Sequence, residues 1–532
     1  MKPTPTTSAI PARVGQTLQP AGSWDFPVQR GPAPVTGDWI AAPTRRRESL
    51  RHPKAATCLC ALIVLLAVFL LAGCAVGPNY RRPAVDAPSN FREAPALSTN
   101  SLADLPWWKM FNDETLQALI RTAVTNNYDI RTAITRVEQA RAIAAQNRAL
   151  FFPQINYQAE AGRGKNAFGN APFSTSGQTV DAFVLAGNTS WEIDLWGRIR
   201  RLNEAARAQL LAQQEARRGV MITVISEVAA AYFQLLALDL ELEIATRTTN
   251  SFGQSLTIFA QRLQGGMASK LETSAAGAAL ASAAATVPDL KRQMVLQENE
   301  LNVLLGRNPG PIVRHHTLLE EQLPPEVPAG LPSQLLERRP DIREAEQQLR
   351  AANAQLGVAK ANFFPQISLT AFLGQASPEL SALTSGGATA WSVAAGLTGP
   401  LFQGGRLVGQ YHQAQAAREE ARLRYQAAAL NAFQEVSNAL VAHQRYAEAR
   451  LELARAVEAY NVAVQVSLLR YTAGRAGYYE VLQEQQLLFP AENALVETEL
   501  NQYVTLVQLY RALGGGWEAG ELHSHASSLK SK

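Results

Sequence analysis

Two kinds of hydrophobic period alternate along this chain of 532 residues. Over 198–263 the apolar residues recur three or four positions apart and proline is absent, and 406–472 is likewise free of proline. These features predict two long α-helices. Each would be about 95 Å long at about 1.5 Å per residue, so neither could wrap a globular core. Their many alanines predict close packing between neighbouring helices.

Each long helix is followed by a turn and by a helix that runs back. The turns are QGGMAS at 264–269 and TAGRAG at 472–477, and the returning helices are expected over 270–305 and 478–513. Glycine commonly ends a helix, which supports both turns. Pro288 lies in the first returning helix, and we expect it to kink that helix.

Four shorter stretches alternate apolar and polar residues with a period of two, which predicts β-strands. They are INYQAEA at 155–161, ISLTAFL at 367–373, and the segments around 190–195 and 391–398. Loops rich in glycine, serine and asparagine are expected inside each pair of strands, at 162–180 and 374–389.

One apolar and one polar face, on strands of about 10 residues, match the wall of a transmembrane β-barrel. Four strands cannot close a barrel, and an open edge in lipid would leave backbone groups unpaired. Several copies of the chain must therefore share one barrel. Two copies would supply eight strands and three copies would supply twelve. A soluble β-subdomain is the alternative, and the long helices argue against it.

The pentapeptide FFPQI occurs twice, at 151–155 and 363–367, each time between a predicted helix and a predicted strand. The preceding helices are expected over 114–150 and 334–362. Pro153 and Pro365 would end the helix and favour an extended residue before them. The phenylalanines suit a membrane-interface belt, with interior packing as the alternative for one of each pair. The flanking sequences match in the same order, which indicates an internal tandem duplication.

Composition and charge narrow the function. The net charge is +4 and no basic face is interleaved with aromatic residues, which argues against nucleic acid as a partner. The three cysteines, Cys58, Cys60 and Cys74, all lie near the N-terminus. Later segments therefore cannot form a disulfide of their own. Because the sequence has no nucleophile–base set, metal-ligand spacing or phosphate loop, we expect no enzymatic activity, metal or cofactor.

The N-terminal region predicts export. An apolar run at 58–72 follows a basic patch at 45–54. About 15 apolar residues suit a signal peptide better than a membrane span, which needs roughly 20. LAGC at 71–74 resembles the lipobox of bacterial lipoproteins, which implies cleavage before Cys74 and a covalent lipid on its thiol. A plain membrane anchor is the alternative. We expect translation to start near Leu50.

The predicted organisation has six parts. In order, they are an N-terminal extension with a lipoprotein signal peptide (1–73), a lipidated N-terminal segment (74–113), a first repeat (114–310), an inter-repeat connector (311–333), a second repeat (334–517) and a polar C-terminal tail (518–532).

Several motifs together resemble the outer membrane factor family, the TolC-like exit ducts of tripartite efflux pumps, and within it the lipoprotein branch paired with RND-type pumps. The matching stretches are CAVGPNYRRP (74–83), IDLWGR (193–198), RRPDIREAEQQLRAANAQLGVAKANFFPQISL (338–369), PLFQGGRL (400–407), RYTAGRAGYYEVL (470–482) and LYRALGGGW (509–517). The resemblance covers nearly all of the chain after Cys74.

The resemblance implies an α+β membrane protein of the bacterial outer membrane, lipid-anchored and membrane-spanning, that extends into the periplasm. It implies a homotrimer in which twelve strands form the transmembrane barrel, four from each chain, and long helices form a periplasmic barrel. The expected partners are outer membrane lipid, a periplasmic adaptor (membrane fusion) protein and an inner-membrane RND pump. The protein itself would be a passive, gated conduit. A protein-secretion outlet and a non-conducting structural envelope lipoprotein are the alternatives.

The resemblance also implies a site at the periplasmic tip, where the two turns meet the adaptor. The implied adaptor-contact residues are Gly265, Gly266, Ala268, Ser269, Gly474, Arg475, Ala476 and Gly477. The implied gate residues are Arg470, Tyr471, Tyr479 and Gln483. Gln483 departs from the family, which has an acid at this position.

Overall fold

The computed structural model describes residues 75–92, 101–104, 110, 113–165, 179–321, 328, 330–384 and 388–515. The signal segment 1–73, the lipobox residue Cys74 and the tail 518–532 lie outside the described residues.

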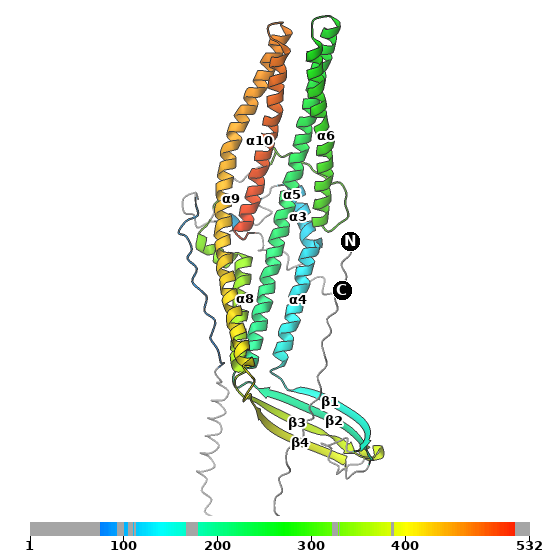
Figure 1. Ribbon diagram of the computed structural model, residues 1–532, viewed down its shortest axis with the longest axis vertical. Helices are drawn as coiled ribbons and strands as arrows, with labels where there is room; N and C mark the ends of the chain where they lie inside the picture. The colour runs from blue at the N-terminus through cyan, green and yellow to red at the C-terminus, as the bar shows by residue number, and fades with distance from the viewer. Residues whose placement is uncertain are drawn as a thin grey trace, which may run out of the picture. The chain divides into compact units, whose positions relative to one another are not determined.

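Two long helical hairpins dominate the fold (Figure 1). The first pairs α5 (Arg198–Gln264) with α6 (Lys270–Leu304), and the second pairs α9 (Arg406–Thr472) with α10 (Tyr478–Ala512). The predicted helices agree with these bounds to within one residue at every end. Helix α6 is continuous through Pro288, so any kink there does not interrupt it.

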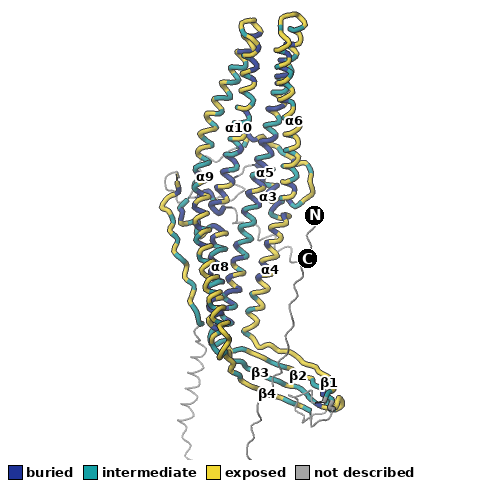
Figure 2. Tube along the Cα trace, in the orientation of Figure 1, coloured by how far each residue is buried: buried dark blue, intermediate teal, exposed yellow. Residues whose placement is uncertain are grey.

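Helix α5 is the central helix of the bundle. It contacts α8, α6, α4, α10 and α3. Its most apolar window meets the length and composition of a membrane span, but 67% of that window is buried inside the protein. Burial against other helices is what a core helix requires, and Figure 2 shows the buried residues following α5 through the bundle. A window of this kind inside a bundle is weak evidence for a membrane span.

The two shorter helical stretches are each interrupted, which corrects the prediction of single helices over 114–150 and 334–362. The first is divided into α3 (Glu114–Asn126) and α4 (Tyr128–Ala149) at Asn127, whose side chain accepts hydrogen bonds from the first amides of α4. The second is divided into α7 (Leu335–Arg338) and α8 (Pro340–Ala361). Arg339 is extended there, because a residue before proline disfavours the helical conformation.

The four strands form one antiparallel sheet in the order β1-β2-β3-β4. They are β1 (Gln154–Lys165), β2 (Thr179–Ile193), β3 (Gln366–Ser377) and β4 (Thr389–Thr398). The predicted loops at 162–180 and 374–389 are too long, because the glycine-containing ends of β1 and β3 still pair in the ladder. A glycine lowers strand propensity without removing its backbone hydrogen bonds.

One face of the sheet carries large apolar side chains that are exposed in the single chain. They include Ile155, Tyr157, Leu185, Leu373, Trp391, Val393 and Leu397. Direct cross-strand partners share a face, and the register places Leu373 opposite Trp391. An exposed apolar face on alternating strand positions is typical of a lipid-facing barrel wall.

The hydrophobic core has two separate parts. The larger one joins α3, α5, α8, α9 and α10 around residues such as Tyr232 and Leu509. The smaller one, which we call the tip core, contains Phe252, Phe259, Ala276, Ala279, Ala283, Tyr471, Tyr478, Val481 and Leu482. Because the tip core includes residues from α5, α6, α9 and α10, it holds the two hairpins together beside their turns.

Candidate functional site

The first turn ends α5 with a compact glycine motif. Gly266 has φ +71°, a conformation that favours glycine. The amide of Met267 donates to the carbonyl of Arg262 at 2.8 Å, as in a Schellman ending. Ser269 then caps α6 in a reciprocal capping box with Glu272. Gly265, Gly266, Ala268 and Ser269, the predicted adaptor-contact residues, all lie in this turn.

The second turn repeats the same geometry with other residues. Gly474 has φ +70°, and the amide of Arg475 donates to the carbonyl of Arg470 at 2.9 Å. Gly477 is the N-cap of α10 and offers no side-chain cap. The second set of predicted contact residues, from Gly474 to Gly477 with Ala476 between them, therefore forms the matching turn.

Aromatic rings lie directly behind the second turn. The ring centroids of Phe259 and Tyr478 are 3.8 Å apart, and those of Phe259 and Tyr471 are 5.4 Å apart. The guanidinium carbon of Arg262 lies 4.2 Å from the centroid of the Tyr471 ring. Contacts of this kind contribute about 0.5–1 kcal/mol at exposed sites. They join α5 of the first repeat to α9 and α10 of the second.

Burial changes the chemistry of one of these tyrosines. The hydroxyl of Tyr478 is buried without a hydrogen-bond partner. Desolvation, and then the nearby Tyr471, raise the pKa of Tyr478 to about 12. The group is therefore neutral at any physiological pH and acts as a packing residue.

The predicted gate residues separate into two groups. Arg470 forms an ion pair of 3.2 Å with Glu480, from the helix across the turn. Tyr471 is buried in the tip core. Tyr479 is 75% exposed in the single chain, and Gln483, one helical turn further along α10, is also exposed. Arg470 and Tyr471 thus hold the tip together, whereas Tyr479 and Gln483 present a free face.

Sequence reasoning missed Phe259 and Tyr478 as members of the tip. The only local signal was their position near the two turns, at an apolar helix position. Their contact joins segments more than two hundred residues apart, and helical periodicity does not identify such a partner.

Below the tip, polar pairs link α5 to α10. The amide Nε2 of Gln485 donates to the hydroxyl of Ser251 at 3.0 Å. Arg247 forms an ion pair of 2.7 Å with Glu492, a carboxyl that is largely buried. Burial raises the pKa of Glu492 while Arg247 opposes that rise. The seam between the hairpins is therefore aromatic at the tip and polar below it.

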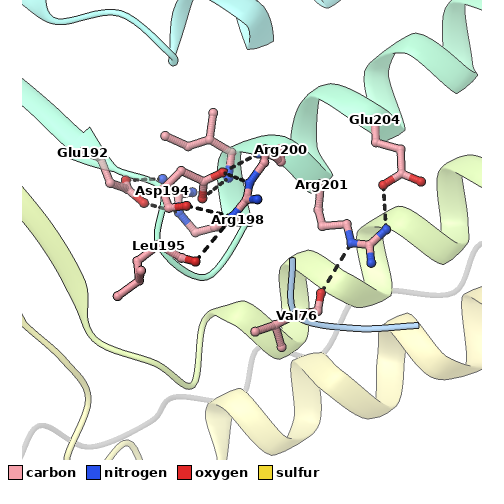
Figure 3. A network of polar contacts seen from close by, with 9 residues as sticks. Val76, Glu192, Asp194, Leu195, Arg198, Arg200, Arg201 and Glu204 are labelled. Atoms are coloured by element: carbon pink, nitrogen blue, oxygen red, sulfur yellow. Dashed lines mark hydrogen bonds and ion pairs between the residues drawn. The ribbon is translucent and has the colours of Figure 1, made fainter. Parts of the chain in front are cut away.

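At the other end of the bundle, the IDLWGR motif forms the turn from β2 into α5 (Figure 3). The carboxylate of Asp194 accepts from the amide of Ile199 at 3.0 Å and from the amide of Arg200 at 2.8 Å. Arg198 binds Glu192 with two hydrogen bonds. A carboxylate at the first amides of a helix stabilises the helix start, so this motif fixes where the sheet becomes a helix.

The segment 75–82 is fixed against the same turn. The amide of Val76 donates to the carbonyl of Trp196 at 2.9 Å. Arg201, which is largely buried, donates to the carbonyl of Val76 at 3.4 Å and to Oδ1 of Asn79 at 2.9 Å (Figure 3). These bonds explain why IDLWGR and the sequence after the lipobox occur together.

Glycines allow this close approach. A Cβ atom on Gly77, whose φ is +103°, would lie 2.6 Å from the Cα atom of Gly357. A Cβ atom on Gly197 would lie 2.7 Å from the Cα atom of Ala75. Neither position can carry a side chain without moving the backbone.

Pro153 and Pro365 lie between the short helices and the sheet. Helix α4 ends at Ala149 and β1 begins at Gln154; α8 ends at Ala361 and β3 begins at Gln366. The indole Nε1 of Trp196 donates to the carbonyl of Pro365 at 2.7 Å. We return to this contact below.

Comparison with known proteins places these features. Residues 119–307 and 331–515 match the family described as "Outer membrane efflux protein". The chain is 33% identical over 474 residues to "Probable efflux pump outer membrane protein TtgC" of Pseudomonas putida, across 88% of this chain and 98% of that protein. It is 32% identical over 465 residues to "Cation efflux system protein CusC" of Escherichia coli K12, across 86% and 99%.

A solved structure agrees with the sequence comparisons. The open state of the MtrE outer membrane channel of Neisseria gonorrhoeae matches with a TM-score of 0.76 and 29% identity, across 84% of this chain and 99% of that one. The matched ranges contain both halves of the duplication, and the predicted fold class, long helical hairpins with a four-stranded membrane sheet, is confirmed. The chain belongs to the outer membrane efflux protein family.

Proposed function

We propose that three copies of this chain form the exit duct of a tripartite efflux pump. The observation that carries the proposal is a membrane-type sheet with two open edges, β1 and β4, on a chain that also has two long hairpins. Unpaired strand edges are very costly in lipid. Twelve strands from three chains would close a barrel wide enough for a lumen, which eight strands would not.

In this proposal the hairpins extend into the periplasm and the duct is passive. The energy for transport comes from an inner-membrane RND pump, and an adaptor protein joins the pump to the duct. The chain acts as a conduit and not as an enzyme. The name of CusC refers to cations and that of TtgC only to an efflux pump, which fits substrate choice by the pump.

The gate of the duct lies at the tip. Tyr479 and Gln483 have no cover within the chain, so three copies of each can form narrow rings around a central axis. The ion pair between Arg470 and Glu480 stabilises the hairpin that carries these rings.

The gate is tested by conductance. The double variant Arg470→Ala, Tyr479→Ala removes the ion pair and the bulky ring, and we expect it to raise single-channel conductance in planar bilayers. The matched control is Leu430→Ala, an exposed position on α9 far from the tip. Equal conductance of the double variant and the wild type would contradict a gate at these residues.

The two turns are the adaptor contact in this proposal. They project from the ends of both hairpins, and their backbone is fixed by the glycine motifs described above. A photo-crosslinking residue at Ala268 or Ala476 should capture the periplasmic adaptor in cells, whereas one at Leu430 should not. Capture of an ABC exporter complex instead would favour the protein-secretion alternative.

A lipid on Cys74 is the final part of the proposal. The support is that segment 75–82 is held at the end of the bundle next to the sheet. Consecutive Cα atoms are about 3.8 Å apart, so Ala75 brings its neighbour to the membrane side of the duct. Mass spectrometry of the mature N-terminus should find an acylated Cys74. An unmodified thiol would contradict lipidation and leave the duct proposal intact.

A further inference from the structure

The turn after β2 packs against the second FFPQI junction. The ring of Trp196 stacks on Phe364 with centroids 4.6 Å apart. Its indole Nε1 donates to the carbonyl of Pro365 at 2.7 Å. This contact is a consequence of strand order, because β2 ends beside the start of β3, with Ile193 opposite Ile367.

The duplication supplies a second copy of the same turn after β4. PLFQGGR at 400–406 corresponds to DLWGR at 194–198, so Phe402 is the counterpart of Trp196. The structure supports this equivalence. Gly197 and Gly405 are the N-caps of α5 and α9, with φ of +78° and +84°.

The two turns differ in what covers them. Trp196 is only partly exposed, whereas Phe402 is 91% exposed and its neighbour Leu401 is fully exposed. Two adjacent large apolar side chains without cover are costly in water, and their counterparts in the first repeat are covered.

The first FFPQI junction has the opposite deficiency. Phe152 is 60% exposed and Pro153 is exposed, although their counterparts Phe364 and Pro365 receive Trp196. Within the described chain, no second-repeat turn reaches this junction, because β1 is an edge strand of the sheet.

Barrel closure brings these two surfaces together. Strand β4 of one protomer must pair with β1 of the next, and an even-stranded barrel makes this pair antiparallel. The end of β4, followed by Phe402, then lies beside the start of β1, which directly follows Phe152 and Pro153.

We propose that Phe402 of each protomer packs on Phe152 and Pro153 of the next protomer. This contact is the intermolecular copy of the contact that Trp196 makes within the chain, and it locks the barrel at the level where the helices begin. It rests on the trimer proposed above. The occupant of the exposed surface is therefore a second copy of this chain rather than lipid or another protein.

Cysteine cross-linking in membranes tests the contact. The variant Phe402→Cys, Phe152→Cys, treated with a short bifunctional maleimide, should give covalent dimers and trimers on denaturing gels. Each single variant should give none, which also controls for Cys58, Cys60 and Cys74. The matched control is Leu430→Cys, Phe152→Cys, because Leu430 is exposed but lies about 36 Å along α9 from its start at about 1.5 Å per residue.

The outcomes separate this contact from the assembly. A trimer by light scattering without cross-linked product would overturn the contact and leave the proposed duct in place. A monomer or dimer by light scattering would overturn both. Cross-linking of Phe402→Cys alone, or only to a different protein, would also overturn the contact.

A second pair of variants gives opposite signs. Phe402→Trp restores the indole donor that Trp196 uses, so the trimer should withstand a higher temperature in detergent before it dissociates. Phe402→Ala should lower that temperature, while the protomer keeps its helical content because Phe402 is exposed in the single chain. Equal dissociation temperatures for all three proteins would contradict the proposal.

Discussion

At the scale of the residue, the same amino acid has different roles on neighbouring positions of one helix. Tyr478 is buried in the tip core, and the next residue, Tyr479, is free. Adjacent positions on a helix point about 100° apart, so one faces the bundle and the other faces away. The tip thus combines a rigid interior with an exposed face on the same turn of α10.

Phe259 tests the rigid interior. It is almost fully buried and contacts both Tyr471 and Tyr478. Phe259→Ala removes a large buried ring and should lower the local stability of the tip by about 3 kcal/mol. Hydrogen exchange should show faster amide exchange over 471–482. Leu469→Ala, at an exposed position of α9, should change nothing, and unchanged exchange in both variants would contradict a tip core.

Glu321 tests a second buried group, at the end of the described connector. Burial, and then the hydrogen-bonded Asp113, raise the pKa of Glu321 from 4.5 to about 7. The folded protein therefore holds this proton at a pH where the unfolded chain has released it. The stability that it contributes is complete below about pH 4.5 and is lost as the pH rises to about 7.

The thermal stability of wild type should therefore contain a component that falls over this range, and Glu321→Gln should remove that component. Glu320 is the matched control, because the backbone amide of Thr317 lowers the pKa of its carboxyl. Its contribution has the opposite sign and is lost as the pH falls. Identical pH profiles for wild type and Glu321→Gln would contradict the buried proton.

At the scale of the element, the long helices and their turns could be predicted closely from the sequence. The stretches 198–263 and 406–472 lack proline, and glycines mark their ends. The interruption at Asn127 could not be predicted in this way, because it depends on an asparagine side chain that caps the next helix. Strand ends were placed too early because glycine was taken to end pairing.

The polar seam between α5 and α10 gives a prediction at this scale. Gln485 and Glu492 are seven residues apart on α10 and both bind polar partners on α5. Replacing Glu492 with Ala leaves Arg247 without its carboxylate but removes a largely buried charge. Replacing Arg247 with Ala leaves that charge unpaired, so it should destabilise the bundle more than Glu492→Ala does. Thermal melts of the two variants measure the difference, and the reverse order would contradict the reading of the seam.

At the scale of the whole molecule, the duplication explains both the symmetry of the fold and its incompleteness. Each repeat supplies a hairpin and two strands, and the turn of the first repeat packs on the junction of the second. The turn of the second repeat and the junction of the first are left uncovered. Sequence pattern predicted that several chains share a barrel, but the position of these two surfaces required the strand order.

The central claim is that this chain forms a conducting duct in the outer membrane. Single-channel recording of the purified, full-length protein in planar bilayers tests it most directly. The account predicts discrete current steps from the wild type, with larger steps from the variant Arg470→Ala, Tyr479→Ala. Trimeric protein that inserts into the bilayer yet gives no current, in the wild type and in this variant, would contradict the account and favour a structural envelope lipoprotein.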